Sequence, residues 1–143
     1  MDNILSNIPP FEAGSVWLVG AGPGDAGLLT LYAVEGLRQA DILVYDALVS
    51  KEILSLTSPT CILEYAGKRG GKPSAKQKDI TERLVTLARE GKRVLRLKGG
   101  DPYIFGRGGE EALRLEAENI PFRVIPGVSS GVGGLAYAGI PLT

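Results

Sequence analysis

Residues 94–111 read Val-Leu-Arg-Leu-Lys-Gly-Gly-Asp-Pro-Tyr-Ile-Phe-Gly-Arg-Gly-Gly-Glu-Glu, and this stretch decides the fold. It opens as an apolar run with a β-branched first residue, which is typical of a strand. Five of the eleven residues from Gly99 to Gly109 are glycine, and a helix is expected from about Glu110. Open α/β sheets bind ligands in loops of this kind, which follow the carboxyl end of a parallel strand. Three large apolar residues inside the loop, 103–105, favour a binding loop over a solvated connection.

The rest of the chain alternates between apolar runs and amphipathic segments. Strands are expected at 16–19, 42–45, 61–65, 93–98 and 122–125. Helices are expected at about 31–40, after Ser50 through Leu56, from a Ser74–Gln77 capping box to Gly91, at 110–119, and through about Ala138. This alternation predicts an α/β fold with a five-stranded, mainly parallel sheet flanked by helices on both faces. Residues 1–14 are expected to be a flexible leader, and residues 15–143 one domain.

Right-handed crossovers place all strand-to-helix loops of such a sheet at one edge, where unusual residues gather. Asp46 ends the second strand, and three roles stay open for it: a partner for a ribose hydroxyl, a general base, or a cap of the next turn. Ser129 and Ser130 stand at an expected helix start, where they either cap the helix or contact a ligand. Arg107 lies between glycines and either reaches a ligand or pairs with Glu110 or Glu111.

Basic residues are interleaved with glycine in the loop after the third strand, at Lys68, Arg69 and Lys72. They form either a solvated face or a positive patch for a substrate with several carboxylates. The loop Gly20–Asp25 resembles a dinucleotide-binding turn but lacks its third glycine. None of the three Gly-Lys pairs in the chain is followed by Ser or Thr, so a Walker A phosphate loop is excluded.

The amino-acid composition argues against several classes of partner and catalytic site. The 143 residues are 44 % hydrophobic and carry 16 basic and 16 acidic side chains, so no net charge selects nucleic acid or an anionic membrane. There is no histidine and a single cysteine, Cys61, which argues against disulfides, histidine bases and a metal site. Cys61 itself is expected to be a core residue of a buried strand. No apolar run is long enough to span a membrane, and the first residues do not form a secretion signal. A cytoplasmic protein without nucleic-acid or membrane partners is expected.

The run from Arg96 to Glu111 resembles the signature of the tetrapyrrole methylase family, in particular of its members that methylate uroporphyrinogen III. The resemblance covers about residues 14–143 and includes the blocks 16–25, 46–49, 66–70, 126–130 and 136–143. It implies that the chain is the N-terminal half of a two-domain α/β enzyme that forms a homodimer. In this family S-adenosylmethionine lies in the cleft between the domains. Without the second domain, the chain is expected to bind the cofactor poorly and not to turn over.

The resemblance also implies roles for individual residues. The cofactor, and its product S-adenosylhomocysteine, would contact Pro23, Gly99, Gly100, Asp101, Ile104, Ser129 and Ser130. Asp46 matches the residue proposed to accept a proton and Lys68 the one proposed to donate a proton, which favours catalysis over capping for Asp46. Arg69, Lys72 and Arg107 would bind the carboxylates of the tetrapyrrole substrate.

The implied reaction is the transfer of two methyl groups to uroporphyrinogen III, first at C2 and then at C7, to give precorrin-2 for sirohaem and cobalamin synthesis. The pyrrole carbon attacks the sulfonium methyl in line, so no metal is needed. Two alternatives stay open: a related precorrin methylase, and a non-catalytic nucleotide-binding module.

Overall fold

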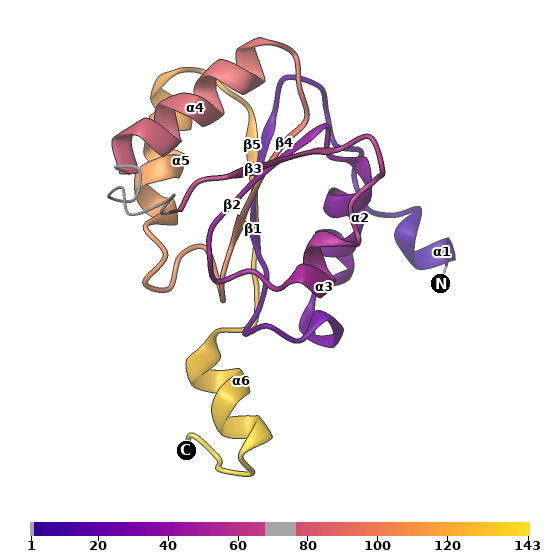
Figure 1. Ribbon diagram of the computed structural model, residues 1–143, viewed down its shortest axis with the longest axis vertical. Coiled ribbons are helices and arrows are strands. Elements are labelled where there is room, and N and C mark those ends of the chain that lie inside the picture. The colour runs from indigo at the N-terminus through magenta and orange to yellow at the C-terminus, as the bar shows by residue number, and fades with distance from the viewer. Residues whose placement is uncertain (1, 68–76) are drawn as a thin grey trace.

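A computed structural model describes residues 2–67 and 77–143, and a five-stranded sheet forms its centre (Figure 1). The strand order is β3–β2–β4–β1–β5, and every neighbouring pair is parallel. The strands are β1 Val16–Gly20, β2 Ile42–Tyr45, β3 Ile62–Tyr65, β4 Val94–Lys98 and β5 Phe122–Ile125. The predicted α/β class and parallel sheet are therefore confirmed, and β2 and β5 have the predicted bounds.

The helices are α1 Asp2–Leu5, α2 Leu31–Gln39, α3 Lys51–Leu54, α4 Gln77–Arg89, α5 Gly108–Ala117 and α6 Ser130–Tyr137, with a short 3₁₀ turn, η1, at Ala26–Leu28. Helices α2 to α6 occur in the predicted order, whereas α1 precedes the first strand and was not predicted. The hydroxyls of Thr30 and Ser50 accept hydrogen bonds from the backbone N–H groups of Ala33 and Ile53, which confirms both predicted caps. The capping box predicted for α4 includes Ser74, which lies outside the described residues.

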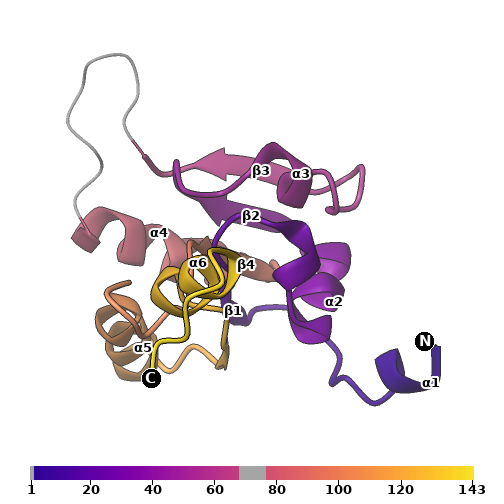
Figure 2. The ribbon, with the colours of Figure 1, turned by 90° about the horizontal axis from the view of Figure 1, so that it is seen from below.

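The sheet separates two hydrophobic layers. Helices α2 and α3 cover one face, and α4 and α5 cover the other (Figures 1 and 2). On α4, Leu84, Leu87 and Ala88 are buried against the sheet. Helix α6 projects beyond the carboxyl ends of the strands (Figure 1). The loops that precede α3, α5 and α6 therefore meet at this edge of the sheet.

Two peripheral segments differ from the sequence predictions. Strand β3 lies at the end of the sheet, so Ile62 and Leu63 are exposed and Cys61 is only half-buried, rather than in the core. In the predicted flexible leader, Phe11 is buried and stacks on Trp17 with ring centroids 4.6 Å apart. Its backbone N–H also donates to Gln39, so the second half of the leader packs on the domain. The stacking of this aromatic pair holds the segment on the domain, although the composition around Phe11 is typical of a loop.

At the amino ends of β2 and β4, Asp41 accepts hydrogen bonds from the backbone N–H, Nε and Nη2 of Arg93, at 2.8, 3.1 and 2.9 Å. Arg93 holds the pKa of Asp41 below its ordinary value of 3.8. A carboxyl group whose pKa is lowered by folding stabilises the fold at pH values above its pKa in the unfolded chain. This stabilisation is lost as the pH falls through its pKa in the folded chain. Both side chains are about 40 % exposed, so the contribution is modest.

We therefore expect Asp41→Asn to lower the free energy of unfolding by about 1 kcal/mol at neutral pH. The difference from the parent should shrink once the pH falls below about 4, because both chains then lack the charge. Urea unfolding at neutral and acid pH measures both quantities. A difference that stays equally large in acid would contradict the ionic origin.

Candidate functional site

Glycine backbones from three loops meet at the carboxyl edge of the sheet. Gly22 and Gly100 exchange two backbone hydrogen bonds, of 3.1 and 2.8 Å, which join the loops after β1 and β4. A Cβ atom placed on Gly20 would lie 2.5 Å from the carbonyl oxygen of Gly100 and 2.7 Å from the Cα atom of Gly127. The three loops therefore approach closely enough to require glycine, and Gly100 also has a positive φ of 64°.

A pocket of about 300 Å³ opens beside this junction. It is lined by Gly22, Pro23, Leu48, Gly99, Gly100, Ile104, Phe105, Ser129 and Ser130. Six of the seven residues that the resemblance implies for the cofactor are in this set. The structure thus brings together side chains from four segments that lie far apart in the sequence.

Asp101, the seventh implied residue, is not among the residues that line the pocket, but it bonds two of the loops around it. Its Oδ1 accepts a hydrogen bond from the N–H of Tyr103 at 2.8 Å, and its Oδ2 accepts one from the N–H of Gly127 at 3.0 Å. It therefore fastens the loop after β4 to the loop before α6.

The lining suits a nucleoside joined to an amino acid, as in S-adenosylmethionine. Leu48, Ile104 and Phe105 offer exposed apolar surface, whereas Gly99 and Gly100 let a ligand approach the backbone. The hydroxyl of Ser129 makes no capping hydrogen bond within the described chain, although Ser129 is the N-cap residue of α6. This favours the ligand-contact alternative for Ser129 over the capping one.

Asp46 lies at the same edge, directly after β2. Its Oδ1 accepts a hydrogen bond from the N–H of Leu48 at 3.1 Å, so the predicted turn-capping role is present. Its Oδ2 lies 3.7 Å from Nη2 of Arg96, and the side chain is 30 % exposed. Because Leu48 lines the pocket, the Asp46 turn forms part of the pocket rim, and capping does not exclude a role in catalysis.

Arg107 pairs with Glu110 rather than reaching into the pocket. Its Nε and Nη2 donate to the two carboxylate oxygens of Glu110, at 3.0 and 2.9 Å, and both side chains are more than half exposed. This pair raises the pKa of Arg107 and lowers that of Glu110. Lys68, Arg69 and Lys72, the other residues predicted to act on the substrate, lie outside the described residues.

Sequence reasoning missed a buried charge cluster beneath this edge. Arg96, Lys98 and Glu111 are at most 4 % exposed, and the strand that carries the two cations was interpreted only as an apolar run. Alternation in Val-Leu-Arg-Leu-Lys was the available signal, since it places both cations on one face of β4. Their partner, Glu111, follows them by more than a dozen residues and becomes apparent only in the fold.

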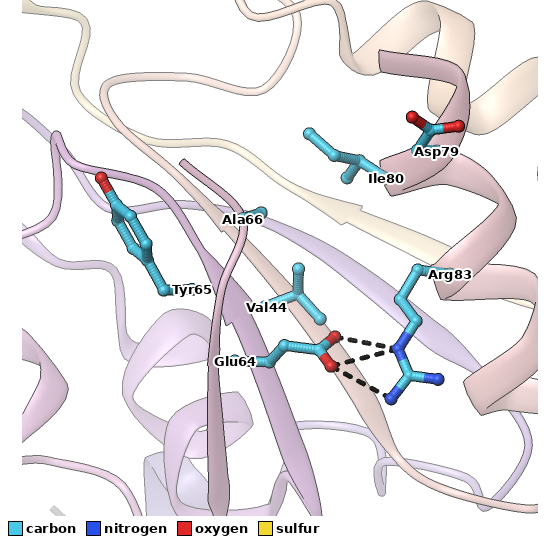
Figure 3. A pocket seen from close by; sticks show the side chains of 7 residues that line it. All are labelled: Val44, Glu64, Tyr65, Ala66, Asp79, Ile80 and Arg83. Carbon is cyan, nitrogen blue, oxygen red and sulfur yellow. Dashed lines mark hydrogen bonds and ion pairs between the residues drawn. The ribbon is translucent and has the colours of Figure 1, made fainter. Parts of the chain in front are cut away.

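A second pocket of about 250 Å³ lies between β3 and α4. Glu64 and Arg83 face each other across it, with Nε of Arg83 3.1 Å from each carboxylate oxygen (Figure 3). Val44, Tyr65, Ala66, Asp79 and Ile80 complete the lining. None of the predicted site residues that the structure describes lines this pocket, and its Glu64–Arg83 ion pair is already satisfied internally.

The fold and the glycine-lined pocket at the carboxyl edge define a class of protein. The chain belongs to the tetrapyrrole (corrin/porphyrin) methylases, whose family model matches residues 15–143. The chain is 64 % identical over 143 residues to a uroporphyrinogen-III C-methyltransferase from a Sinorhizobium species. It is also 58 % identical over 130 residues to a sirohaem synthase from Actinobacillus pleuropneumoniae.

Solved structures agree with this assignment. A uroporphyrin-III C-methyltransferase from Thermus thermophilus superposes with a TM-score of 0.81 and 48 % identity, covering 91 % of this chain and 55 % of that one. A uroporphyrin-III C-methyltransferase from the same organism, solved in complex with S-adenosylhomocysteine, gives a TM-score of 0.76 and 46 % identity over 90 % of this chain and 53 % of that one.

The chain spans only part of these relatives. It covers 51 % of the Sinorhizobium protein and 27 % of the Actinobacillus protein, while the matches cover 100 % and 91 % of this chain. Within residues 2–67 and 77–143, no helix is long and apolar enough to cross a membrane. The same residues contain no group of three or more potential metal-ligating side chains.

Proposed function

We propose that the chain forms the cofactor-binding half of a uroporphyrinogen-III C-methyltransferase, which methylates C2 and then C7 to give precorrin-2. The observation that carries the proposal is the pocket at the carboxyl edge, which gathers Pro23, Gly99, Gly100, Ile104, Ser129 and Ser130 on a glycine framework. The similarity to a uroporphyrinogen-III C-methyltransferase over the whole chain supports the choice of substrate.

S-adenosylmethionine supplies an electrophilic methyl group, and the chain's own residues have to bind it, orient it and manage a proton. Gly99 and Gly100 expose backbone to the ligand, Ser129 and Ser130 offer hydroxyls, and Asp101 holds the two loops together. Apolar surface from Ile104 and neighbouring side chains keeps water away from the reacting atoms. No residue in this scheme needs a metal.

Asp46 accepts a proton from the methylated substrate in this proposal, and Lys68 donates one. Two observations support this role: the Asp46 side chain is 30 % exposed, and it accepts a hydrogen bond from Leu48, which lines the pocket. Arg69, Lys72 and Arg107 bind substrate carboxylates. For Arg107 this requires exchanging Glu110 for a substrate carboxylate, which is feasible because the pair is exposed and therefore weak.

The remaining half of the site, a homodimeric assembly and a cytoplasmic location are also part of the proposal. Catalysis is therefore best tested in a chimera. In it the chain is followed, after Thr143, by the part of the Sinorhizobium relative that lies beyond the matched segment. The isolated 143-residue chain is expected to bind the cofactor weakly and not to turn over, so normal methyl-transfer rates from it would contradict that part of the proposal.

Asp46→Asn in the chimera is expected to lower the kcat for methyl transfer to uroporphyrinogen III by about 100-fold or more, because a general base contributes roughly that much. Binding of S-adenosylhomocysteine should stay within about two-fold, since Asn keeps the oxygen that accepts from Leu48. Transfer of labelled methyl groups measures the first quantity and calorimetry the second.

Asp41→Asn is the matched control, because Asp41 precedes the same strand at its opposite end. It should leave kcat unchanged. An unchanged kcat in Asp46→Asn would remove Asp46 from the reaction. A chimera that methylates a precorrin but not uroporphyrinogen III would favour the related-methylase alternative, and one that binds cofactor without any transfer would favour the non-catalytic module.

A further inference from the structure

Three charged side chains lie buried beneath the rim of the pocket, on the face of the sheet that α4 and α5 cover. Arg96 is 3 % exposed, Lys98 4 % and Glu111 not at all. Burying a charge is costly unless it is paired and hydrogen-bonded. Two cations on one strand, next to the candidate site, therefore call for an explanation beyond stability.

Glu111 holds the cluster together from α5. Its Oε1 accepts hydrogen bonds from Nζ of Lys98 at 2.9 Å, from Nε2 of Gln77 at 3.0 Å and from Nε of Arg96 at 3.3 Å. The Nη1 of Arg96 also donates to the carbonyl oxygens of Val44 and Leu97. The guanidinium is thus fixed on one side by a carboxylate and on another by the backbone of β2 and β4.

The remaining end of Arg96 faces the pocket rim. Its Nη2 lies 3.7 Å from Oδ2 of Asp46, while Oδ1 of Asp46 accepts from the N–H of Leu48. The carboxylate of Asp46 therefore accepts a hydrogen bond at Oδ1 and forms an ion pair at Oδ2. Among the described residues, the cluster thus brings two cations, Arg96 and Lys98, together with two acidic side chains, Glu111 and Asp46.

Lys98 shows how closely these charges are coupled. Burial and the neighbouring Arg96 lower the pKa of Lys98, whereas Glu111 and Asp46 oppose that shift. Lys98 also directly precedes Gly99, so the cluster is continuous with the glycine loop that lines the pocket.

We propose that Arg96, braced by Glu111, is a positioning residue that fixes the carboxylate of Asp46 at the rim of the cofactor pocket. Its consequence for catalysis rests on the proposed function, whereas the contact itself does not. The guanidinium suits this role because its planar fork donates hydrogen bonds to Glu111 and two carbonyls and also forms an ion pair with Asp46. A lysine keeps the charge but cannot make these contacts simultaneously.

The first test uses the 143-residue chain and needs no activity. In Arg96→Lys, the amide hydrogen of Leu48 should exchange about five-fold faster in NMR measurements, because an unfixed Asp46 no longer accepts from it continuously. Arg93→Lys is the matched control, since Arg93 pairs with Asp41 at the other end of the same two strands. Its Leu48 exchange should equal that of the parent, and an unchanged rate in Arg96→Lys would overturn the proposal.

A second measurement leaves Arg96 unchanged and therefore does not require Arg96→Lys to fold. In the otherwise unaltered chain, the Nε–H signal of Arg96 should shift when Asp46 is replaced by Asn and should stay in place when Asp41 is replaced by Asn. Equal shifts from both substitutions, or none from either, would show that Arg96 and Asp46 are not coupled.

The effect of Arg96→Lys on catalysis is measured in the chimera. Arg96→Lys should lower kcat about ten-fold while the KM for S-adenosylmethionine stays within about two-fold, a split expected of a residue that acts on the reacting geometry alone. Arg93→Lys should leave both constants unchanged. If kcat is unaffected, Arg96 does not position a catalytic group. If the parent chimera transfers no methyl group while the Leu48 result is as expected, the proposed function fails and the positioning contact stands.

Discussion

Replacing Gly127 by alanine is expected to disrupt the junction of the three glycine loops. The added Cβ would overlap the carbonyl oxygen of Gly100 and lie 2.8 Å from the Cα atom of Gly20. Both neighbours are backbone atoms that the sheet and the loop hydrogen bonds hold in place, so neither can rotate away. Overpacking of this kind costs about 3 kcal/mol of the free energy of unfolding, measured by urea denaturation. Affinity for S-adenosylhomocysteine should fall at least about ten-fold, because Gly100 lines the pocket.

Gly134→Ala on α6 is the matched control for this prediction. A Cβ at that position meets nothing within 4 Å, and alanine favours a helix over glycine by about 1 kcal/mol. Stability should therefore stay the same or rise. A Gly127→Ala chain as stable as the parent would show that the loops can move apart, and that their close approach does not shape the pocket.

Asp101→Ala is expected to have the next largest effect on the cofactor pocket. It leaves the N–H groups of Tyr103 and Gly127 without their carboxylate partner, which costs about 1–3 kcal/mol if neither finds water. It also releases the loop after β4 from the loop before α6. Calorimetry should show affinity for S-adenosylhomocysteine reduced by about ten-fold or more in the chimera.

Asp101→Asn tests whether the two hydrogen bonds that Asp101 accepts, rather than the size of its side chain, organise the pocket. Asparagine has a single acceptor oxygen, so it can retain one of the two hydrogen bonds but not both. Its affinity should fall between those of the parent and the alanine variant. Equal affinity for all three chains would mean that Asp101 neither organises the pocket nor contacts the cofactor.

Much of this architecture was predictable because it follows from local pattern. The apolar runs of β2 and β5 and the hydroxyl caps at Thr30 and Ser50 are decided by residues within a few positions of each other. The crossover rule then placed the loops at one edge, and the structure confirms that the residues of the pocket meet there. Their roles in binding and catalysis remain proposals.

The remaining features depend on which segments meet in space. Nothing near Arg96 in the sequence shows that Glu111 and Asp46 flank it, so the buried cluster emerges only from the packing of α5 on the sheet. The exposure of β3 follows from its place at the end of the strand order, which an apolar run cannot reveal. Phe11 likewise has a role only because Trp17 stands opposite it.

We expect this chain to carry a preformed part of the cofactor site at the carboxyl edge of its sheet. An NMR titration of the 143-residue chain with S-adenosylhomocysteine tests this expectation most directly, since amide signals report even weak binding. The largest shifts are expected at Gly22, Gly99, Gly100, Ser129 and Ser130. Shifts gathered instead around Glu64, Ala66 and Arg83 in the pocket of Figure 3, or no shifts at saturating ligand, would contradict the expectation.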